Sequence, residues 1–206
     1  MPDVTDGQPP AHHESPIRRF LFESALIVFS ILLALAVNQW SDSRKQRELT
    51  ERALTAIRGE ITGNVKRIEE GRPYHFSLET ELRRADSAGV VHRYSDLKHA
   101  APDWSGFENP ELDATAWQSA LTLGVAPNLG FDTLQTLSRL YGLQTRFDQY
   151  NSAGIPTFDF SDEAMHSTVR RMYVYVATMR TNEDTLLNRY NKALKLLGSR
   201  SSAPTR

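Results

Sequence analysis

An uncharged apolar stretch near the N-terminus constrains this chain more than any other feature. No charged residue occurs from Ser24 to Ser41, and nine of these 18 residues are Leu, Ile, Val or Phe. As a helix the stretch is about 27 Å long, close to the thickness of the hydrocarbon core of a bilayer. Basic residues flank both ends, and Trp40 lies where an interfacial aromatic residue is expected. We therefore predict a transmembrane helix over residues 20–41.

Two alternatives remain for this stretch. It also fits a signal peptide, because Arg18-Arg19 precede it and Ala34-Leu35-Ala36 has the small-x-small pattern of a cleavage site. Against cleavage, Glu23 follows the basic pair, and the helical pattern continues past residue 36 without a breaker. A core helix of a soluble fold is disfavoured, because such helices are amphipathic and this one is apolar on all sides.

The sequence ESALIVFSILLALAVNQW, from Glu23 to Trp40, resembles the opening of a group of uncharacterised bacterial single-pass membrane proteins. In that group an acidic residue begins the span and Asn-x-Trp closes it before a charged helix. The group often has Gly where this chain has Ser30, and both residues are small. Weaker similarities follow at Asn64, His75, Ala116-Trp117 and Tyr141. The resemblance implies an anchored helical domain and brings no known activity.

Two features of the sequence favour opposite orientations in the membrane. Two Lys or Arg residues precede the span and four lie within residues 44–52, which favours a cytoplasmic C-terminal side. However, long domains translocate largely regardless of charge, and a basic pair before an apolar run is the usual arrangement of a signal anchor. We expect a bacterial inner-membrane protein with its main domain on the non-cytoplasmic side.

Composition excludes several classes of function. The chain has no cysteine, which excludes disulfides, thiolate catalysis and cysteine zinc sites. Its formal net charge is −1, with acidic residues matching basic ones throughout, so we predict no nucleic-acid partner. The chain also lacks nucleophile-elbow, phosphate-loop and His-Glu-x-x-His motifs, and we predict no cofactor.

The remainder predicts an all-α fold: a helical domain over residues 42–199 between disordered tails at 1–19 and 200–206. We expect the span to continue as a helix to about Glu70, a break at Gly71-Arg72-Pro73, and a second helix to about Ala88. Residues 89–112 are predicted to be irregular, with one short turn near Asp96.

Two further helices are expected before the last one. The first would be short, capped by Asp113 and ended by Gly124, with Trp117 and Leu121 on one side. The second would open at a capping box formed by Asp132 and Gln135 and run to about Tyr150. Residues of this helix available for burial are Leu134, Leu137, Leu140, Tyr141 and Phe147.

The clearest periodicity belongs to a long C-terminal helix, which we expect to be capped by Ser161 and ended by Gly198. Residues recur there at alternating spacings of four and three, which is typical of a packed helix seam: Met165, Val169, Met172, Val176, Met179, Leu186, Tyr190, Ala193 and Leu197. Glu183 occupies one seam position. A buried carboxylate needs a partner, so we expect the seam to open to water at this point. The helix is a candidate to pack along the one that leaves the membrane, whose own seam contains Asn64.

Candidate functional residues fall into three sets. Glu23, Ser30 and Asn38 lie on roughly one face of the span, which together with Trp40 indicates contacts within the membrane. The candidate bundle seam comprises Asn64, Trp117, Tyr141, Met172 and Glu183. A possible enzymatic site would use residues of the 90–113 loop, namely His92, Asp96, His99, Asp103 and Glu108.

Metal binding finds little support elsewhere in the sequence. A carboxylate di-metal bundle needs two Glu-x-x-His pairs, and this chain has one, Glu163 with His166. His75 and Glu79 are four residues apart on a predicted helix. We interpret both pairs as helix-surface residues.

These observations favour a membrane-anchored helical interaction or scaffold protein without chemistry of its own. Its partners would be the lipid bilayer and another protein or a second copy of itself. One alternative is a membrane-tethered hydrolase or metal-binding enzyme that uses the 90–113 loop. Another is a secreted soluble helical protein left after signal cleavage.

Overall fold

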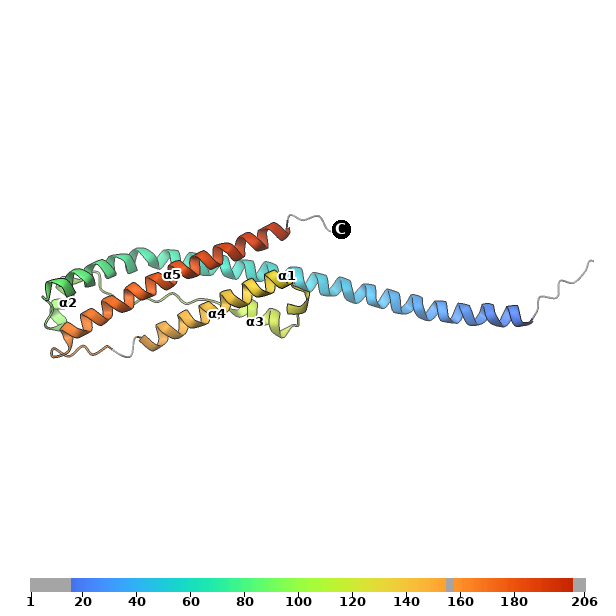
Figure 1. Ribbon diagram of the computed structural model, residues 1–206, viewed down its shortest axis with the longest axis horizontal. Helices are drawn as coiled ribbons and strands as arrows, with labels where there is room; N and C mark the ends of the chain where they lie inside the picture. Colours follow the sequence, from blue (N-terminus) through green and yellow to red (C-terminus); the bar gives the residue numbers. More distant parts are fainter. Residues whose placement is uncertain (1–15, 155–157, 202–206) are drawn as a thin grey trace, which may run out of the picture. The chain divides into compact units, whose positions relative to one another are not determined.

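The computed structural model describes residues 16–154 and 158–201, and helices are the regular structure in these ranges. The elements are α1 (Pro16–Ala88), α2 (Tyr94–Ala100), α3 (Thr115–Thr122), the 3-10 helix η1 (Ala126–Asn128), α4 (Phe131–Gly154) and α5 (Met165–Ser201) (Figure 1). The predicted all-α class is confirmed. The chain divides into two compact units, one ending at Arg47 and the other beginning at Glu48.

The first unit contains the apolar part of α1. Its large apolar side chains between Phe20 and Val37 are each more than half exposed. Among the described residues, α1 alone is long and apolar enough to cross a membrane, and its most apolar 18-residue window is 0% buried. The stretch is therefore not a core helix of the helical domain. Residues 1–15 of the predicted N-terminal tail lie outside the described residues, whereas residues 16–19 belong to α1.

Helix α1 is continuous through the predicted break, so that prediction is wrong. Pro73 lies inside the helix, where it removes a backbone hydrogen bond and crowds the preceding turn at a cost of about 3 kcal/mol. Ile68 before the proline and Leu78 and Leu82 after it are all buried in one core. Each such burial contributes roughly 1.5–3 kcal/mol, which offsets the cost of the proline and keeps the helix in one piece.

The buried face of α1 is a single stripe in the second unit. Its members follow one another at spacings of four and three residues, which keeps them on one side of the helix. Buried members of the stripe are Ile57, Ile61, Asn64, Ile68, His75, Leu78, Leu82 and Ala85, with Gly71 at the remaining position. The stripe packs against α5, which lies beside this part of α1 (Figure 1).

Helix α5 buries its whole predicted seam. All ten seam residues are buried: Met165, Val169, Met172, Val176, Met179, Glu183, Leu186, Tyr190, Ala193 and Leu197. Contacts of His75 with Glu183 and of Asn64 with Tyr190 show that α5 runs antiparallel to α1.

Both predicted ends of α5 are wrong. The helix begins at Met165, and residues 161–164 form a turn before it, so Ser161 is not its cap. It also continues through Gly198 to Ser201, because a helix tolerates an interior glycine at a cost of about 1 kcal/mol. Residues 200 and 201 of the predicted C-terminal tail therefore belong to α5, and residues 202–206 lie outside the described residues.

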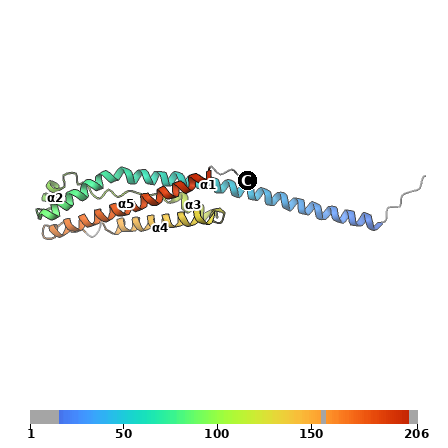
Figure 2. The same ribbon diagram turned by 45° about the horizontal axis from the view of Figure 1, so that its top comes forward.

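Helix α4 lies beside α5 and runs antiparallel to it (Figure 2). Its residues Leu137, Leu140, Tyr141 and Phe147 are buried as expected, and Leu134 is half-buried. The helix begins at Phe131, which places Asp132 within its first turn, and it extends beyond Tyr150 to Gly154.

Residues 101–114 form an irregular segment that returns along α1. The hydroxyl of Tyr74 donates to the carbonyl oxygen of Gly106, and further along, Asn64 of α1 bonds to the backbone of Asp113. Side chains of α1 thus satisfy backbone groups that would otherwise be buried without partners. The segment delivers the chain to the start of α3.

Helix α3 departs from its predicted form at two positions. Asp113 does not cap it, because the N-cap is Ala114 and the Asp113 carboxylate lies 2.7 Å from the guanidinium of Arg67. Trp117 is buried, but Leu121 is 44% exposed. The predicted end of the helix at Gly124 is confirmed. Gly124 follows the helix with a φ of 69°, a backbone conformation that favours glycine.

Candidate functional site: polar residues buried between the helices

Seven polar side chains lie between α1, α4 and α5, and we refer to them as the interior polar column. They are Glu60, Asn64 and His75 of α1, Tyr141 and Gln144 of α4, and Glu183 and Tyr190 of α5. Six of them are buried and Glu60 is half-buried. Buried polar groups are costly unless they are hydrogen-bonded, so their partners decide what the column does.

Glu60 links α1 to both α3 and α4. Its carboxylate accepts hydrogen bonds from the hydroxyl of Tyr141 at 2.6 Å and from the backbone N–H groups of Ala116 and Trp117 at 2.6 and 3.4 Å. Since Ala114 cannot cap α3 with its own side chain, the carboxylate of Glu60 performs that role from another helix. A negative charge is favourable at this end of the helix dipole.

Trp117 and Tyr141 close this end of the core. Their rings stack with centroids 5.4 Å apart and planes 3° from parallel. Burial, followed by the hydrogen bond to Glu60, raises the pKa of Tyr141 well above its ordinary value. The tyrosine therefore stays protonated and acts as a donor throughout the physiological pH range.

Asn64 joins α1 to the 101–114 segment. Its amide nitrogen donates to the carbonyl oxygen of Asp113 at 2.7 Å, and its amide oxygen accepts from the N–H of the same residue at 2.9 Å. Gln144 of α4 also donates to that carbonyl at 3.1 Å, and its amide oxygen accepts from the hydroxyl of Tyr190 at 2.7 Å. Burial raises the pKa of Tyr190. These bonds are specific to one register of the three helices, which is the best-attested use of polar residues in a helical seam.

His75 and Glu183 form a buried pair of ionisable side chains in the column. The two side chains are 0% and 1% exposed, and Nδ1 of His75 lies 2.8 Å from Oε1 of Glu183. Nε2 of the same ring lies 3.1 Å from the carbonyl oxygen of Phe107. Two predictions are therefore wrong: the α5 seam does not open to water at Glu183, and His75 is not a helix-surface residue. The partner that a buried Glu183 requires is a histidine one helix away.

Gly71 makes room for the histidine ring. A Cβ atom added to Gly71 would lie 3.3 Å from Cε1 of His75, closer than most such contacts. On either side of the pair, more exposed ion pairs also connect α1 to α5, Glu79 with Arg180 and Arg72 with Asp184. Glu79 is thus an ion-pair partner of α5 and not a companion of His75 at a shared site.

The candidate loop site does not assemble in the described residues. Asp96 accepts hydrogen bonds from the backbone N–H groups of His92 and Arg93 at the start of α2, which lowers its pKa. His99 contacts the carbonyl oxygen of Ser95, and Glu108 accepts from the hydroxyl of Ser105. Within residues 16–154 and 158–201, no three His, Asp or Glu side chains converge as metal ligands would.

The candidate residues of the apolar stretch all lie on the exposed surface of α1. The hydroxyl of Ser30 donates to the carbonyl oxygen of Leu26 at 2.8 Å, which satisfies it within the helix. The guanidinium of Arg44 lies 5.8 Å from the ring centroid of Trp40, a separation within the range of cation–π attraction. Their proposed role in membrane contacts stays a prediction.

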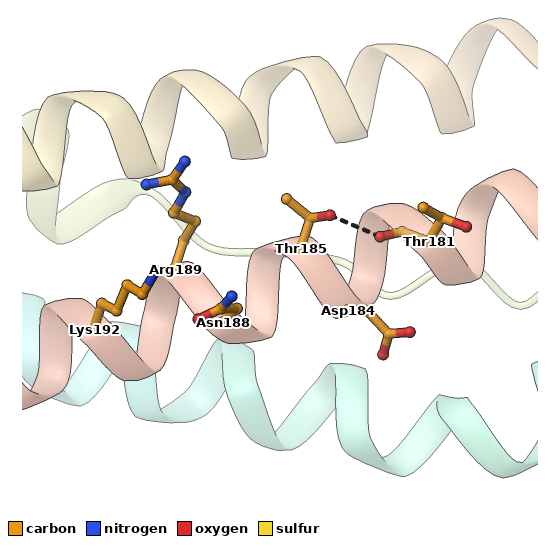
Figure 3. Close-up of a pocket in the computed structure, with 6 residues that line it drawn as sticks. All are labelled: Thr181, Asp184, Thr185, Asn188, Arg189 and Lys192. Carbon is orange, nitrogen blue, oxygen red and sulfur yellow. Dashed lines mark hydrogen bonds between the residues drawn. The ribbon is translucent and has the colours of Figure 1, made fainter.

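A shallow groove on the outer surface of α5 offers no assembled chemistry. It is lined by Thr181, Asp184, Thr185, Asn188, Arg189 and Lys192, all from this one helix. Figure 3 shows Arg189 and Asp184 pointing to opposite sides of the helix. Thr185 is satisfied locally, because its hydroxyl donates to the carbonyl oxygen of Thr181.

Comparisons with protein families, with characterised proteins and with solved structures find no match to this chain. The function is therefore inferred from the geometry of the chain itself. Three members of the interior polar column, Glu60, His75 and Gln144, belong neither to the candidate bundle seam nor to the predicted seam of α5. Their spacing along α1 and α4 is compatible with burial, but the partners that stabilise them come from distant parts of the sequence.

Proposed function

We propose that this protein is a single-pass protein of a bacterial inner membrane whose helical domain is an interaction module rather than a catalyst. The observation that carries the proposal is the unburied apolar part of α1. Eighteen uncharged residues whose side chains face outward on every side require an apolar solvent, and a helix satisfies its own backbone hydrogen bonds within lipid.

The interior polar column supports a structural role for the helical domain. Each of its seven side chains bonds to another helix or to the 101–114 segment. Residues of the kind that often perform catalysis, such as His75 and Glu183, are enclosed and paired with each other. A domain whose polar groups specify helix register is suited to presenting a defined surface to a partner.

We propose that the first partner is a second copy of the chain, which binds through the apolar stretch. Glu23, Ser30 and Asn38 recur at spacings of seven and eight residues, which places them on one side of α1. A shallow groove in this region is lined by Ser30, Ala34, Asn38 and Ser41 together with the apolar residues Ile31, Leu33, Leu35 and Val37. Small residues allow close approach of two helices in lipid, and an asparagine amide can hydrogen-bond across such an interface.

Chemical crosslinking of the protein in native membranes tests this proposal. We expect the parent protein to give a crosslinked dimer and the Glu23→Leu, Asn38→Leu double variant to give markedly less. Gln39→Leu is the matched control, because it removes an amide at the same depth but about 100° around the helix from Asn38. Equal dimer yields for the parent and the double variant would refute self-association through this face.

The side of the membrane occupied by the helical domain is a separate part of the proposal. We place it outside the cytoplasm, on the arrangement of a basic pair before an apolar run. A reporter active only outside the cytoplasm, fused to the C-terminus, tests this placement. We expect activity from that reporter and none from a cytoplasmic reporter at the same position; the reverse pattern would place the domain in the cytoplasm.

A further inference from the structure

We propose that His75 and Glu183 hold one proton between them and carry no net charge, which makes the packing of α5 on α1 dependent on pH. This inference is independent of the proposed membrane anchor, because all the residues it uses belong to the unit that begins at Glu48. It follows from the two hydrogen-bond partners of the histidine ring.

Both ring nitrogens of His75 face oxygen atoms. Nε2 faces the carbonyl oxygen of Phe107, which only accepts hydrogen bonds, so Nε2 carries a hydrogen. Nδ1 faces Oε1 of Glu183 at 2.8 Å. Two atoms that both offer lone pairs would repel each other at this separation, so a proton lies between them. It belongs either to an imidazolium facing a carboxylate or to a carboxylic acid facing a neutral ring, and the pair is neutral overall in both cases.

The charged groups near His75 and Glu183 are paired with one another, so the position of the shared proton depends on these two residues. On α1 and α5 the neighbouring charges are Arg72, Glu79, Arg180 and Asp184, and they form two ion pairs of opposite charges. Tyr74 lies against the histidine ring, with its hydroxyl bonded to the 101–114 segment.

The 101–114 segment and α4 complete the surroundings of the pair. The segment contributes a backbone carbonyl oxygen at Phe107. On α4, the part-buried acid is Asp148, whose pKa is raised by burial and whose charge acts on Tyr190, two turns of α5 from Glu183. The second oxygen of Glu183 has no hydrogen-bond partner among the described residues. An ionised carboxylate would be poorly stabilised there, which favours the carboxylic acid and neutral ring.

The proton count gives the sign of the pH dependence. In the unfolded chain a histidine loses its proton near pH 6.5 and a glutamic acid near about 4.3. Above about pH 6.5 the unfolded pair binds no proton whereas the folded pair binds one, so stability falls as pH rises. Between these two values both states bind one proton and the pair contributes no slope. Below about pH 4.3 the unfolded pair binds two protons, so stability falls again as pH decreases.

Glu183→Gln separates the shared proton from the hydrogen bond. The glutamine amide donates to Nδ1 of a neutral ring, so shape and hydrogen bonding are kept while the shared proton is lost. The variant should show no slope from this pair above about pH 6.5. Below that value the histidine of the unfolded variant binds a proton. In the folded variant the buried ring next to the glutamine amide binds none, so the stability of the variant falls as pH decreases. Parent and variant therefore have slopes that differ on both sides of neutrality.

The test is urea unfolding of the full-length protein in detergent micelles, measured by circular dichroism from pH 5 to pH 9. We expect the unfolding constant of the parent, divided by that of Glu183→Gln, to rise about tenfold per pH unit above neutrality. This slope corresponds to the one proton that the folded parent binds and the variant does not. Asp148 and the two ion pairs are common to both proteins and cancel in the comparison. Parallel pH profiles for parent and variant would overturn the proposal.

A measurement on the parent protein alone keeps the proposal testable if the variant fails to fold. Nitrogen NMR of the histidine rings distinguishes His75 from the exposed His92 and His99, which serve as internal references. We expect the nitrogen signals of the His75 ring to stay constant from pH 5 to pH 9, because the pair keeps its proton throughout this range. A change of the His75 signals within this range would rule out the shared proton.

Discussion

Replacing Gly71 with alanine tests how firmly the ring of His75 is held. In a helix interior alanine is more stable than glycine by roughly 0.5–1 kcal/mol. Nothing lies within 4 Å of a Cβ atom added at Gly59, so we expect Gly59→Ala to gain this stability in full. At Gly71 the added atom would lie 3.3 Å from Cε1 of His75. The ring cannot move away freely, because Glu183 and Phe107 hold both of its nitrogens.

The cost at Gly71 exceeds the gain in helix propensity. Overpacking a well-filled core costs roughly 1–3 kcal/mol. We therefore expect Gly71→Ala to be less stable than Gly59→Ala by about 2 kcal/mol, a difference of about 30-fold in the unfolding constant. Urea unfolding of both full-length variants in the same detergent, monitored by circular dichroism, measures the difference. Equal stabilities for the two variants would refute the fixed placement of the ring.

Two further predictions concern the other end of the interior polar column. Glu60→Ala removes the acceptor for the N–H groups of Ala116 and Trp117, so we expect these amides to exchange with deuterium about tenfold faster by mass spectrometry; unchanged exchange would contradict the cap. Burial raises the pKa of both Tyr141 and Tyr190, so the folded domain keeps both phenol protons and loses stability as pH rises above about 10. Tyrosinate absorbance should accompany unfolding; its appearance from these two rings before the loss of helical signal would contradict their burial.

The long C-terminal helix could be predicted because its evidence is local. Its seam repeats every seven residues over the whole helix, and each seam position is buried. The helix ends were less predictable. Ser161 and Gly198 have the residue types expected of a cap and a stop, but capping preferences amount to about 1 kcal/mol. Tertiary packing of the flanking turns easily outweighs a preference of that size.

The continuity of α1 could not be predicted from residue preferences. Gly71 and Pro73 indicate a break on local rules, and that interpretation divided one repeating pattern into two pieces. Read without interruption, Ile68, Gly71, His75 and Leu78 keep the spacing of four and three residues found throughout the stripe. The periodicity was therefore present in the sequence, and the glycine within it provides space for a ring.

The partners within the interior polar column were beyond prediction from one sequence. The sequence shows Asn64 and Glu183 as polar residues in apolar seams, but their partners lie 49 and 108 residues away, at Asp113 and His75. Spacing along one helix indicates which residues face inward. It does not indicate which groups of another helix they meet, and the pairing of His75 with Glu183 depends on that tertiary arrangement.

The central claim is that lipid is the solvent for the uncharged residues between Ser24 and Ser41. Fractionation of cells producing the full-length chain, followed by intact mass measurement, tests it directly. We expect the chain in the membrane fraction, resistant to extraction by alkaline carbonate, soluble in detergent, and with a mass that includes residues 20–41. Recovery of the same uncleaved chain from the aqueous fraction without detergent would contradict the claim, as would a mass showing removal of the first 36 residues.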